Sequence, residues 1–267
     1  MDKIGGVYMV RVGISGAAGR MGNALVSVAA QNPEIYNIGL LLEAKGNSTV
    51  GARIGGFTIT DDLKTGLAGV DVFIDFTTPS ATLKHLKELV DAKKPVVIGT
   101  TGFDSNELFE IELASKRIPI VLSSNYSIGV NVMWKLLKEA TRALKDDYDI
   151  DIIEAHHRMK KDAPSGTAIT TAEVILKEKG LDPKANMVFG RDGRENIRDR
   201  NQVGVFAVRA GGIVGEHTAI FGSMGDKLEI SHTAFSRETF AMGALKAAKF
   251  LAKKQAGLYS MADVLQL

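Results

Sequence analysis

The chain of 267 residues contains no cysteine. Disulfide bridges and thiolate metal sites are therefore excluded, although the absence of cysteine does not decide the cellular compartment. No apolar run reaches the roughly 18 residues that a transmembrane helix needs. The N-terminus also lacks the basic segment and apolar core of a secretory signal. We therefore expect a cytoplasmic protein without a membrane partner.

The sequence also lacks an excess of charge of either sign. The 33 Lys and Arg residues nearly balance the 31 Asp and Glu residues, which leaves a formal net charge of +2. No basic tail and no mixed basic and aromatic patch is present, so nothing favours a nucleic-acid partner. With 45% apolar and 24% charged residues, the composition is that of an ordinary globular protein able to bury a substantial core.

A glycine-rich turn lies between a predicted strand at residues 9–15 and a predicted helix at residues 23–31. Its spacing is Gly-x-x-Gly-x-x-Gly rather than the usual dinucleotide fingerprint. In this context Gly16 would permit the tight turn, Gly19 the approach of a pyrophosphate and Gly22 the contact of helix with strand. A plain strand-to-helix connection would carry the same glycines, so the turn alone is a weak signal. We expect the residues before Met9 to form an extension.

Glu43 stands at the end of the second predicted strand, residues 38–42, about 20 residues beyond the glycine turn. An acid there holds the ribose 2′-hydroxyl of NAD and would repel the 2′-phosphate of NADP. Lys45 follows closely and could attract that phosphate. The prediction therefore leans toward NADH and leaves NADPH open.

Small polar residues follow three further predicted strands, at residues 70–76, 95–98 and 118–122. In open α/β sheets ligands bind at the carboxyl ends of the strands. Each of these loops alone could be a plain connection. As a set they predict one crevice for the nicotinamide and its ribose.

The second half of the chain breaks the strand–helix alternation. A helix at residues 128–144, with Met133 and Trp134 in the core, precedes a run of strands at residues 203–209, 215–221 and 227–233. We expect residues 181–202, which are polar and rich in Arg, to be an exposed mobile loop. The predicted fold is α/β: an N-terminal Rossmann-type domain with a parallel sheet, and a C-terminal α+β domain with an open mixed sheet. The expected bounds are residues 1–128, joined by the C-terminal helix at 240–267, and residues 129–239.

The most informative stretch runs from Glu154 to Ala168 and reads Glu-Ala-His-His-Arg-Met-Lys-Lys-Asp-Ala-Pro-Ser-Gly-Thr-Ala. It connects a predicted strand at residues 150–154 to a predicted helix at residues 168–179. The start of a helix offers amides without intrahelical partners and favours negative charge. Together with the imidazole and ammonium groups, this predicts a carboxylate-binding loop.

A simpler interpretation of the same loop stays open. Ser165 or Thr167 could be an ordinary helix cap, and the cations could be a solvated run. His217 and His232 show no metal-ligand spacing, so we interpret both as structural.

The loop resembles the signature of the dihydrodipicolinate reductase family, which acts in lysine and diaminopimelate biosynthesis. The resemblance covers nearly the whole chain, and its other matching segments are Gly16-x-x-Gly19-Arg20-Met21-Gly22 and residues 73–77, 99–102, 125–131 and 214–218. It implies a Rossmann-type domain that binds NADH or NADPH. It also implies a substrate domain whose open sheet builds a homotetramer.

The resemblance also implies site residues. His156 corresponds to the family's acid/base residue and Lys160 to its proton donor. The matched substrate-carboxylate contacts are His157, Lys160, Ser165, Gly166 and Thr167. The matched cofactor contacts are Gly16, Ala17, Ala18, Gly19, Arg20, Met21, Glu43, Gly99, Thr100, Thr101, Ser123, Ser124, Asn125 and Tyr126. No metal is implied. Ala44 stands where some members have Arg, which leaves the choice of nucleotide open.

The implied reaction is reduction of 4-hydroxy-tetrahydrodipicolinate, a cyclic imine with two carboxylates, to tetrahydrodipicolinate. A hydride from the nicotinamide would leave an electron-rich intermediate that must accept a proton. A histidine, with its ordinary pKa near 6.5, suits that task. Two other hypotheses stay open: an aldehyde or hydroxy-acid dehydrogenase of similar plan, and a dinucleotide-sensing protein without catalysis.

Overall fold

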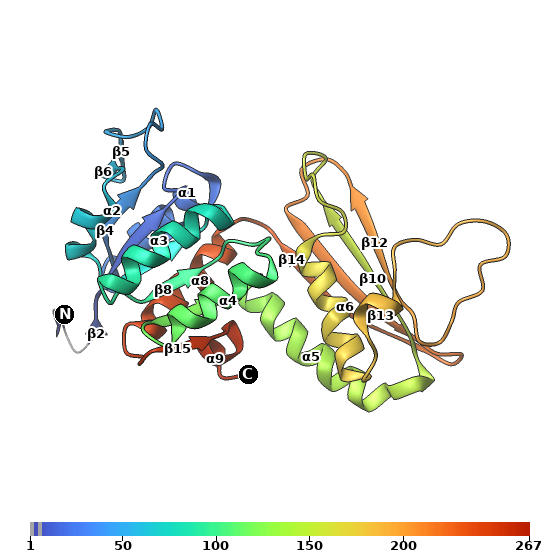
Figure 1. The fold of residues 1–267 in the computed structure, drawn as a ribbon. Helices are drawn as coiled ribbons and strands as arrows, with labels where there is room; N and C mark the ends of the chain where they lie inside the picture. Colours follow the sequence, from blue (N-terminus) through green and yellow to red (C-terminus); the bar gives the residue numbers. More distant parts are fainter. Residues whose placement is uncertain (1–2, 5–6) are drawn as a thin grey trace. The chain divides into compact units, whose positions relative to one another are not determined.

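The computed structural model describes residues 3–4 and 7–267, and these form two compact units (Figure 1). The first unit contains the described residues up to Ile128 together with Arg237–Leu267, and the second contains Gly129–Ser236. The expected N-terminal extension includes residues 1, 2, 5 and 6, which lie outside the described residues. β1 (Lys3–Ile4) and β2 (Val7–Tyr8) pair as a small separate sheet.

The first unit is built on an eight-stranded sheet in the order β15-β9-β8-β7-β3-β4-β6-β5. All neighbouring strands are parallel except β5, which pairs antiparallel with β6. The strands are β3 (Val10–Ser15), β4 (Tyr36–Leu42), β5 (Arg53–Ile54), β6 (Phe57–Thr60), β7 (Val72–Asp75), β8 (Val96–Ile98), β9 (Pro119–Leu122) and β15 (Gly257–Tyr259). Apolar runs such as Val72–Asp75 are buried on both faces, as expected for a covered parallel sheet.

Helices cover both faces of this sheet. α1 and α8 share one apolar cluster, and α3 and α4 share the other. The helices are α1 (Arg20–Ala30), α2 (Leu63–Gly66), α3 (Pro79–Asp91), α4 (Ser105–Ser115), α8 (Glu238–Leu251) and α9 (Met261–Leu265), with a 3-10 turn η1 (Leu67–Gly69). In chain order the six strands from β3 to β9, leaving out β5, have the Rossmann arrangement three-two-one-four-five-six. The order reverses between β3 and β7, and this is where such folds bind dinucleotides.

The second unit contains a five-stranded mixed sheet in the order β11-β12-β10-β13-β14. β10 is parallel to β12 and antiparallel to β13. The strands are β10 (Asp149–His156), β11 (Met187–Val188), β12 (Val203–Arg209), β13 (Gly215–Gly222) and β14 (Lys227–Ala234); the helices are α5 (Ile128–Leu144), α6 (Gly166–Glu178) and α7 (Pro183–Asn186), with a 3-10 turn η2 (Lys145–Asp147). The expected fold class, a mostly parallel Rossmann-type sheet followed by a mixed sheet, is confirmed.

One face of the second sheet changes from apolar to polar along β10. Ile150 and Ile152 are buried against α5 and α6, whereas Glu154 and His156 continue the same face at the carboxyl end of the strand. Side chains alternate between the faces of a strand, so these four residues point the same way. The apolar half fixes the sheet on its helices, and the polar half is free to build a site.

The segment expected to be a mobile loop, residues 181–202, is more structured than predicted. It contains α7 and the short strand β11. Both Arg191 and Arg198 then bind the carboxylate of Asp151 on β10, at distances of 2.7 and 2.6 Å. Residues 192–197 are largely exposed, as expected, but these two ion pairs tie the segment to the sheet.

Candidate active site

The glycine turn between β3 and α1 has the geometry of a phosphate-binding turn. Gly16 has φ +70°, a left-handed conformation that favours glycine. A Cβ added to Gly22 would lie 2.3 Å from the carbonyl oxygen of Gly16, so only glycine allows this close packing of α1 on the turn. The helix is preceded by Gly19, which contributes no capping side chain. The N-terminus of α1 is therefore suited to bind a pyrophosphate.

Glu43 lies directly after β4, next to the glycine turn. Its carboxylate accepts hydrogen bonds from the amide of Ala18 at 2.8 Å and from Nδ2 of Asn47 at 3.0 Å. A carboxylate has about four acceptor sites. Glu43 thus braces the turn and still has acceptor sites for ribose hydroxyls.

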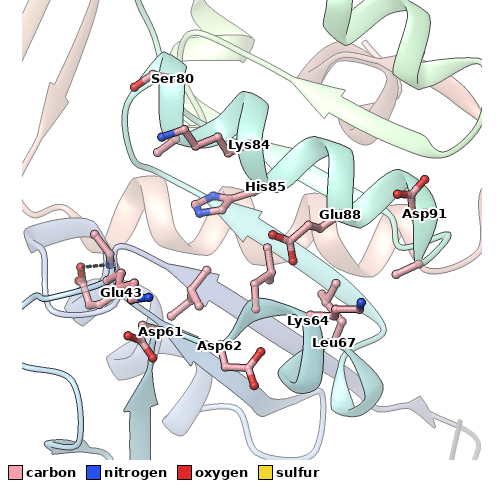
Figure 2. A pocket seen from close by; sticks show the side chains of 16 residues that line it. Glu43, Asp61, Asp62, Lys64, Leu67, Ser80, Lys84, His85, Glu88 and Asp91 are labelled. Atoms are coloured by element: carbon pink, nitrogen blue, oxygen red, sulfur yellow. Dashed lines mark hydrogen bonds between the residues drawn. The ribbon is translucent and has the colours of Figure 1, made fainter.

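A cavity of about 910 Å³ opens beside Glu43. Figure 2 shows Glu43 at one end of this cavity and Asp91 at the other, with His85 of α3 between them. Its volume lies within the usual range for ligand pockets. Lys45 and Lys84 line it together with several acids, so the pocket offers partners for both a hydroxyl and a phosphate.

The polar segments after β8 and β9 lie side by side, because those strands are neighbours. Thr100, Thr101, Ser123 and Ser124 line a second, smaller cavity of about 260 Å³. The hydroxyl of Thr100 is used within the fold: it contacts the Thr82 hydroxyl at 2.8 Å and accepts the Thr77 amide.

Tyr126 is also committed to the core. Its hydroxyl donates to the carbonyl oxygens of Ile98 and Val121, and burial raises the pKa of this hydroxyl well above its ordinary value. Of the expected cofactor contacts, Thr100 and Tyr126 therefore offer backbone atoms rather than side chains.

One buried pair in the first unit was not predicted from the sequence. Asp75, fully buried at the end of β7, contacts Nδ1 of His85 at 2.8 Å and accepts the Thr77 hydroxyl at 2.6 Å. The pair joins α3 to the carboxyl end of β7. An Asp at the end of an otherwise apolar strand was the only signal in the sequence.

The predicted substrate residues all lie in the second unit, around the carboxyl end of β10 and the start of α6. His156 is buried, and its Nδ1 lies 2.6 Å from Oε2 of Glu154. No hydrogen bond from the described part of the chain reaches its Nε2. A Cβ on Gly215 would come within 3.1 Å of this atom, so glycine leaves room beside it.

Helix α6 begins next to this imidazole. Ser165 is its N-cap, with Oγ accepting the amide of Ala168 at 3.2 Å, and Gly166 and Thr167 form its first turn. The simpler interpretation of Ser165 as a cap is therefore confirmed, which does not exclude a ligand at the same helix end. A Cβ on Gly166 would meet no heavy atom within 4 Å, so open space borders the first turn.

The loop cations take different positions. Nζ of Lys160 pairs with Asp162 at 2.9 Å, and its side chain is only 21% exposed. His157 follows β10 and is half-buried, whereas Arg158 and Lys161 are exposed. The structure thus places His156, His157, Lys160 and the Ser165–Thr167 turn in one unit, as a group.

His217 also belongs to this group, although its sequence context indicated a structural role. On β13 it pairs in register with Glu154, its Nε2 lies 3.0 Å from the Ser165 hydroxyl, and its ring centroid lies 5.2 Å from that of His156. Burial, together with the neighbouring His156, lowers the pKa of His217 to about 3. The available signal was its position on the buried face of a predicted strand, in phase with apolar Ala219.

Burial and charge work against each other at the two central groups. Burial would raise the pKa of Glu154, but hydrogen bonds from Arg209, His156 and the Ser165 amide hold that pKa below its ordinary value. Burial lowers the pKa of His156; Glu154 opposes this effect, while Lys160 and Arg209 add to it. The protonated ring of His156 is therefore a stronger acid than the protonated ring of a free histidine.

Residues 3–4 and 7–267 contain no group of three or more His, Cys, Asp or Glu side chains that could hold a metal ion. No helix among these same residues is long and apolar enough to cross a bilayer.

The first unit has a Rossmann-type sheet with a phosphate-binding turn, and the second has a buried histidine beside a helix N-terminus. These two features together are those of an NAD(P)-dependent oxidoreductase. The family model "Dihydrodipicolinate reductase, N-terminus" matches residues 10–126, and "Dihydrodipicolinate reductase, C-terminus" matches residues 129–265. The chain therefore belongs to the dihydrodipicolinate reductase family. Its activity is the NAD(P)H-dependent reduction of 4-hydroxy-tetrahydrodipicolinate in lysine and diaminopimelate biosynthesis.

Solved structures share the fold. Dipicolinate-bound dihydrodipicolinate reductase from Paenisporosarcina sp. TG-14 is similar with a TM-score of 0.73 and 24% identity, over 96% of this chain and 99% of that one. A probable dehydrogenase from Thermotoga maritima gives a TM-score of 0.64 at 11% identity, over 96% and 93% of the two chains. An amine dehydrogenase from Mycobacterium smegmatis gives 0.57 at 10% identity, over 94% and 95%.

Proposed function

We propose that the first unit is the dinucleotide-binding domain and that the second unit binds the dicarboxylate substrate. The glycine turn and the α1 N-terminus would hold the pyrophosphate of the cofactor. Glu43 would hold the adenosine ribose in the cavity of about 910 Å³. The residues after β8 and β9, from Gly99 to Thr101 and from Ser123 to Tyr126, would hold the nicotinamide half.

The choice of nucleotide follows from charges in the adenosine cavity. The Glu43 carboxylate favours a free 2′-hydroxyl and hence NADH. Lys45 and Lys84 line the same cavity and would offset the repulsion of a 2′-phosphate. We therefore propose that NADH is preferred and that NADPH is also used.

Carboxylate binding is assigned to the start of α6 and the cations beside it. The Paenisporosarcina reductase binds dipicolinate, a planar ring with two carboxylates. In this chain, Ser165, Gly166 and Thr167 would bind one carboxylate through the helix N-terminus, with His157 and Lys160 supplying positive charge and donors. These contacts would hold the ring in one orientation for reduction.

His156 is assigned the proton transfer, together with Lys160. When bound, the reduced nicotinamide supplies a hydride. Loss of the 4-hydroxyl as water gives the conjugated carbon–carbon bond that accepts this hydride. The electron-rich enamine that results must take a proton, and Nε2 of His156 is the ring nitrogen that can deliver it. The ammonium of Lys160 would stabilise negative charge that develops during transfer or donate the proton itself. The observation that supports this assignment is that Nδ1 of His156 is held at 2.6 Å by Glu154 while space remains beside Nε2.

Steady-state kinetics on enzymatically generated substrate, with NADH and with NADPH, test this assignment. We expect His156→Gln and Lys160→Ala each to lower kcat by about 10²-fold or more, the scale of lost acid–base catalysis. Lys161→Ala removes an exposed neighbouring cation and should leave kcat unchanged. Near-normal turnover in both site variants would refute the assigned roles.

We further propose that the chain forms a homotetramer through the sheet of the second unit and works in the cytoplasm. The outer face of that sheet carries exposed apolar side chains, among them Ile153 and Val208, which a partner chain would cover. The cytoplasmic location is supported by the need for NAD(P)H.

A further inference from the structure

One of the most extensively hydrogen-bonded side chains of the second unit is not one of the expected catalytic residues. Glu154 is fully buried and accepts four hydrogen bonds: from Nδ1 of His156, from the amide of Ser165, and from Nη1 and Nη2 of Arg209. The four distances lie between 2.6 and 2.8 Å. One carboxylate thus joins the ends of β10 and β12 to the start of α6.

Arg209 compensates the buried negative charge of Glu154. Its guanidinium contacts both oxygens of Glu154 and also donates to the carbonyl oxygen of Asp162, in the loop before α6. A buried carboxylate without such a partner would be strongly destabilising. A two-pronged guanidinium–carboxylate contact is also geometrically specific, so it fixes where the carboxylate oxygens point.

The ionised carboxylate decides which nitrogen of His156 carries the proton. A carboxylate in this state only accepts hydrogen bonds, so Nδ1 of the neutral ring must be the donor. Nε2 is then the nitrogen that gains and loses the second proton. The space beside Nε2, where Gly215 has no side chain, lies on the opposite edge of the ring from Glu154.

We propose that Glu154 and Arg209 are positioning residues for His156 that act in opposite directions. The carboxylate holds the proton on Nδ1 and stabilises the imidazolium, and the guanidinium limits that stabilisation by sharing the same carboxylate. This inference rests on the proposed role of His156 as acid, and it adds the pair that sets its tautomer and its acidity.

Charged or titratable groups surround His156 on its own strand and on the elements packed against it. Glu154 lies on β10, Arg209 on β12, Lys160 in the loop before α6 and His217 on β13. Glu154 raises the pKa of His156, whereas burial, Lys160 and Arg209 lower it. Removing Glu154 and removing Arg209 should therefore shift the histidine in opposite directions, which a loss of packing alone would not do.

The test is an NMR titration of isotope-labelled histidine in the full chain, with the His156 signal assigned by its absence in His156→Gln. We expect Glu154→Gln to lower the pKa of His156 by about one unit, a roughly tenfold loss of imidazolium at a given pH. Arg209→Gln should raise it, and Arg209→Lys, which keeps the charge, should stay near wild type. If Glu154→Gln or Arg209→Gln does not fold, Arg209→Lys, which keeps a cation beside Glu154, still tests the inference: a His156 pKa clearly different from that of wild type would contradict it.

A matched control lies on the same strand. Asp151 is also held by two arginines, Arg191 and Arg198, but it lies five residues from His156, roughly 16 Å along β10. Asp151→Asn should weaken the fold and leave the His156 titration unchanged. A His156 pKa that moves equally in Asp151→Asn, or that shifts in the same direction in Glu154→Gln and Arg209→Gln, would overturn the inference.

The pH dependence of kcat separates this inference from the proposed function. If both hold, the alkaline limb of the rate profile, where His156 loses the proton that it must donate, follows the measured His156 pKa in each variant. If the titrations shift as expected while the rate profiles stay at the wild-type position, Glu154 and Arg209 still set the acidity of His156. In that case the assignment of His156 as catalytic acid fails.

Discussion

His217 connects the chemistry of single residues to the stability of the fold. It is 5% exposed, and its Nδ1 is buried without a hydrogen-bond partner in the described residues. Such a site disfavours the imidazolium, which would need a second acceptor. The folded protein therefore contains a neutral histidine that must gain a proton when the chain unfolds in mild acid.

We expect the free energy of unfolding to fall as the pH drops from about 6.5, the ordinary histidine value, toward the folded pKa of about 3. In that window the unfolded chain binds a proton that the folded chain does not, so acid favours unfolding. His217 alone would contribute up to about 5 kcal/mol of this loss. Urea midpoints near neutral pH and in mild acid should show a smaller change for His217→Gln than for wild type. Equal pH slopes for the two proteins would contradict the neutral state of His217.

At the scale of elements, local patterns predicted most of the fold. The helix at residues 128–144 and the strand at residues 203–209 have the predicted bounds, because their apolar periodicity is contained within each segment. α4 was not predicted, because Leu108, Phe109 and Leu113 are exposed and leave no apolar stripe on the helix. β15 was missed because it is three residues long and pairs with the distant strand β9.

The candidate site was likewise predictable only where its residues are close together in the sequence. The loop from Glu154 to Ala168 could be predicted because its groups are contiguous. The partner of Glu154, Arg209, lies 55 residues further along the chain and reaches it only through the parallel pairing of β10 with β12. His217 reaches Ser165 through the pairing of β10 with β13. Register between strands is a tertiary property, so no local pattern contains these contacts.

The first residue of α6 allows a test at this scale. We expect Gly166→Ala to fold normally, because the added Cβ meets no heavy atom within 4 Å, and to gain up to about 1 kcal/mol from helix propensity. The same methyl group would occupy the space proposed for a carboxylate, so KM for the substrate should rise about tenfold, or roughly 1.4 kcal/mol. Thermal unfolding and steady-state kinetics measure the two effects separately.

Gly22→Ala is the matched control, because its Cβ would lie 2.3 Å from a backbone oxygen of the glycine turn. We expect this variant to lose stability and cofactor binding, the reverse of the Gly166→Ala pattern. An unchanged substrate KM in Gly166→Ala would remove the start of α6 from the carboxylate site.

At the scale of the whole molecule, the exposed face of the second sheet is the surface through which we propose that the homotetramer forms. α5 and α6 share one apolar cluster with the sheet, on the face that carries Ile150 and Ile152. On the other face the side chains of Ile153 and Val208 are 41% and 44% exposed, and the guanidinium of Arg191 lies 5.3 Å from the ring centroid of Phe206. Exposed apolar groups concentrated on one sheet face are typical of an interface between chains.

Ile153→Arg places a charge in the middle of this face, where assembly would bury it without a partner. We expect the variant to have a smaller assembled mass than wild type, since an unpaired buried charge costs several kcal/mol. Phe109→Arg on α4 changes a side chain that is 56% exposed in the first unit, so it serves as the control and should leave the mass unchanged. Light scattering after size exclusion measures both. If Ile153→Arg has the wild-type mass while wild type is a tetramer, the tetramer must use a different surface, and the sheet face would need another explanation for its exposed isoleucine and valine.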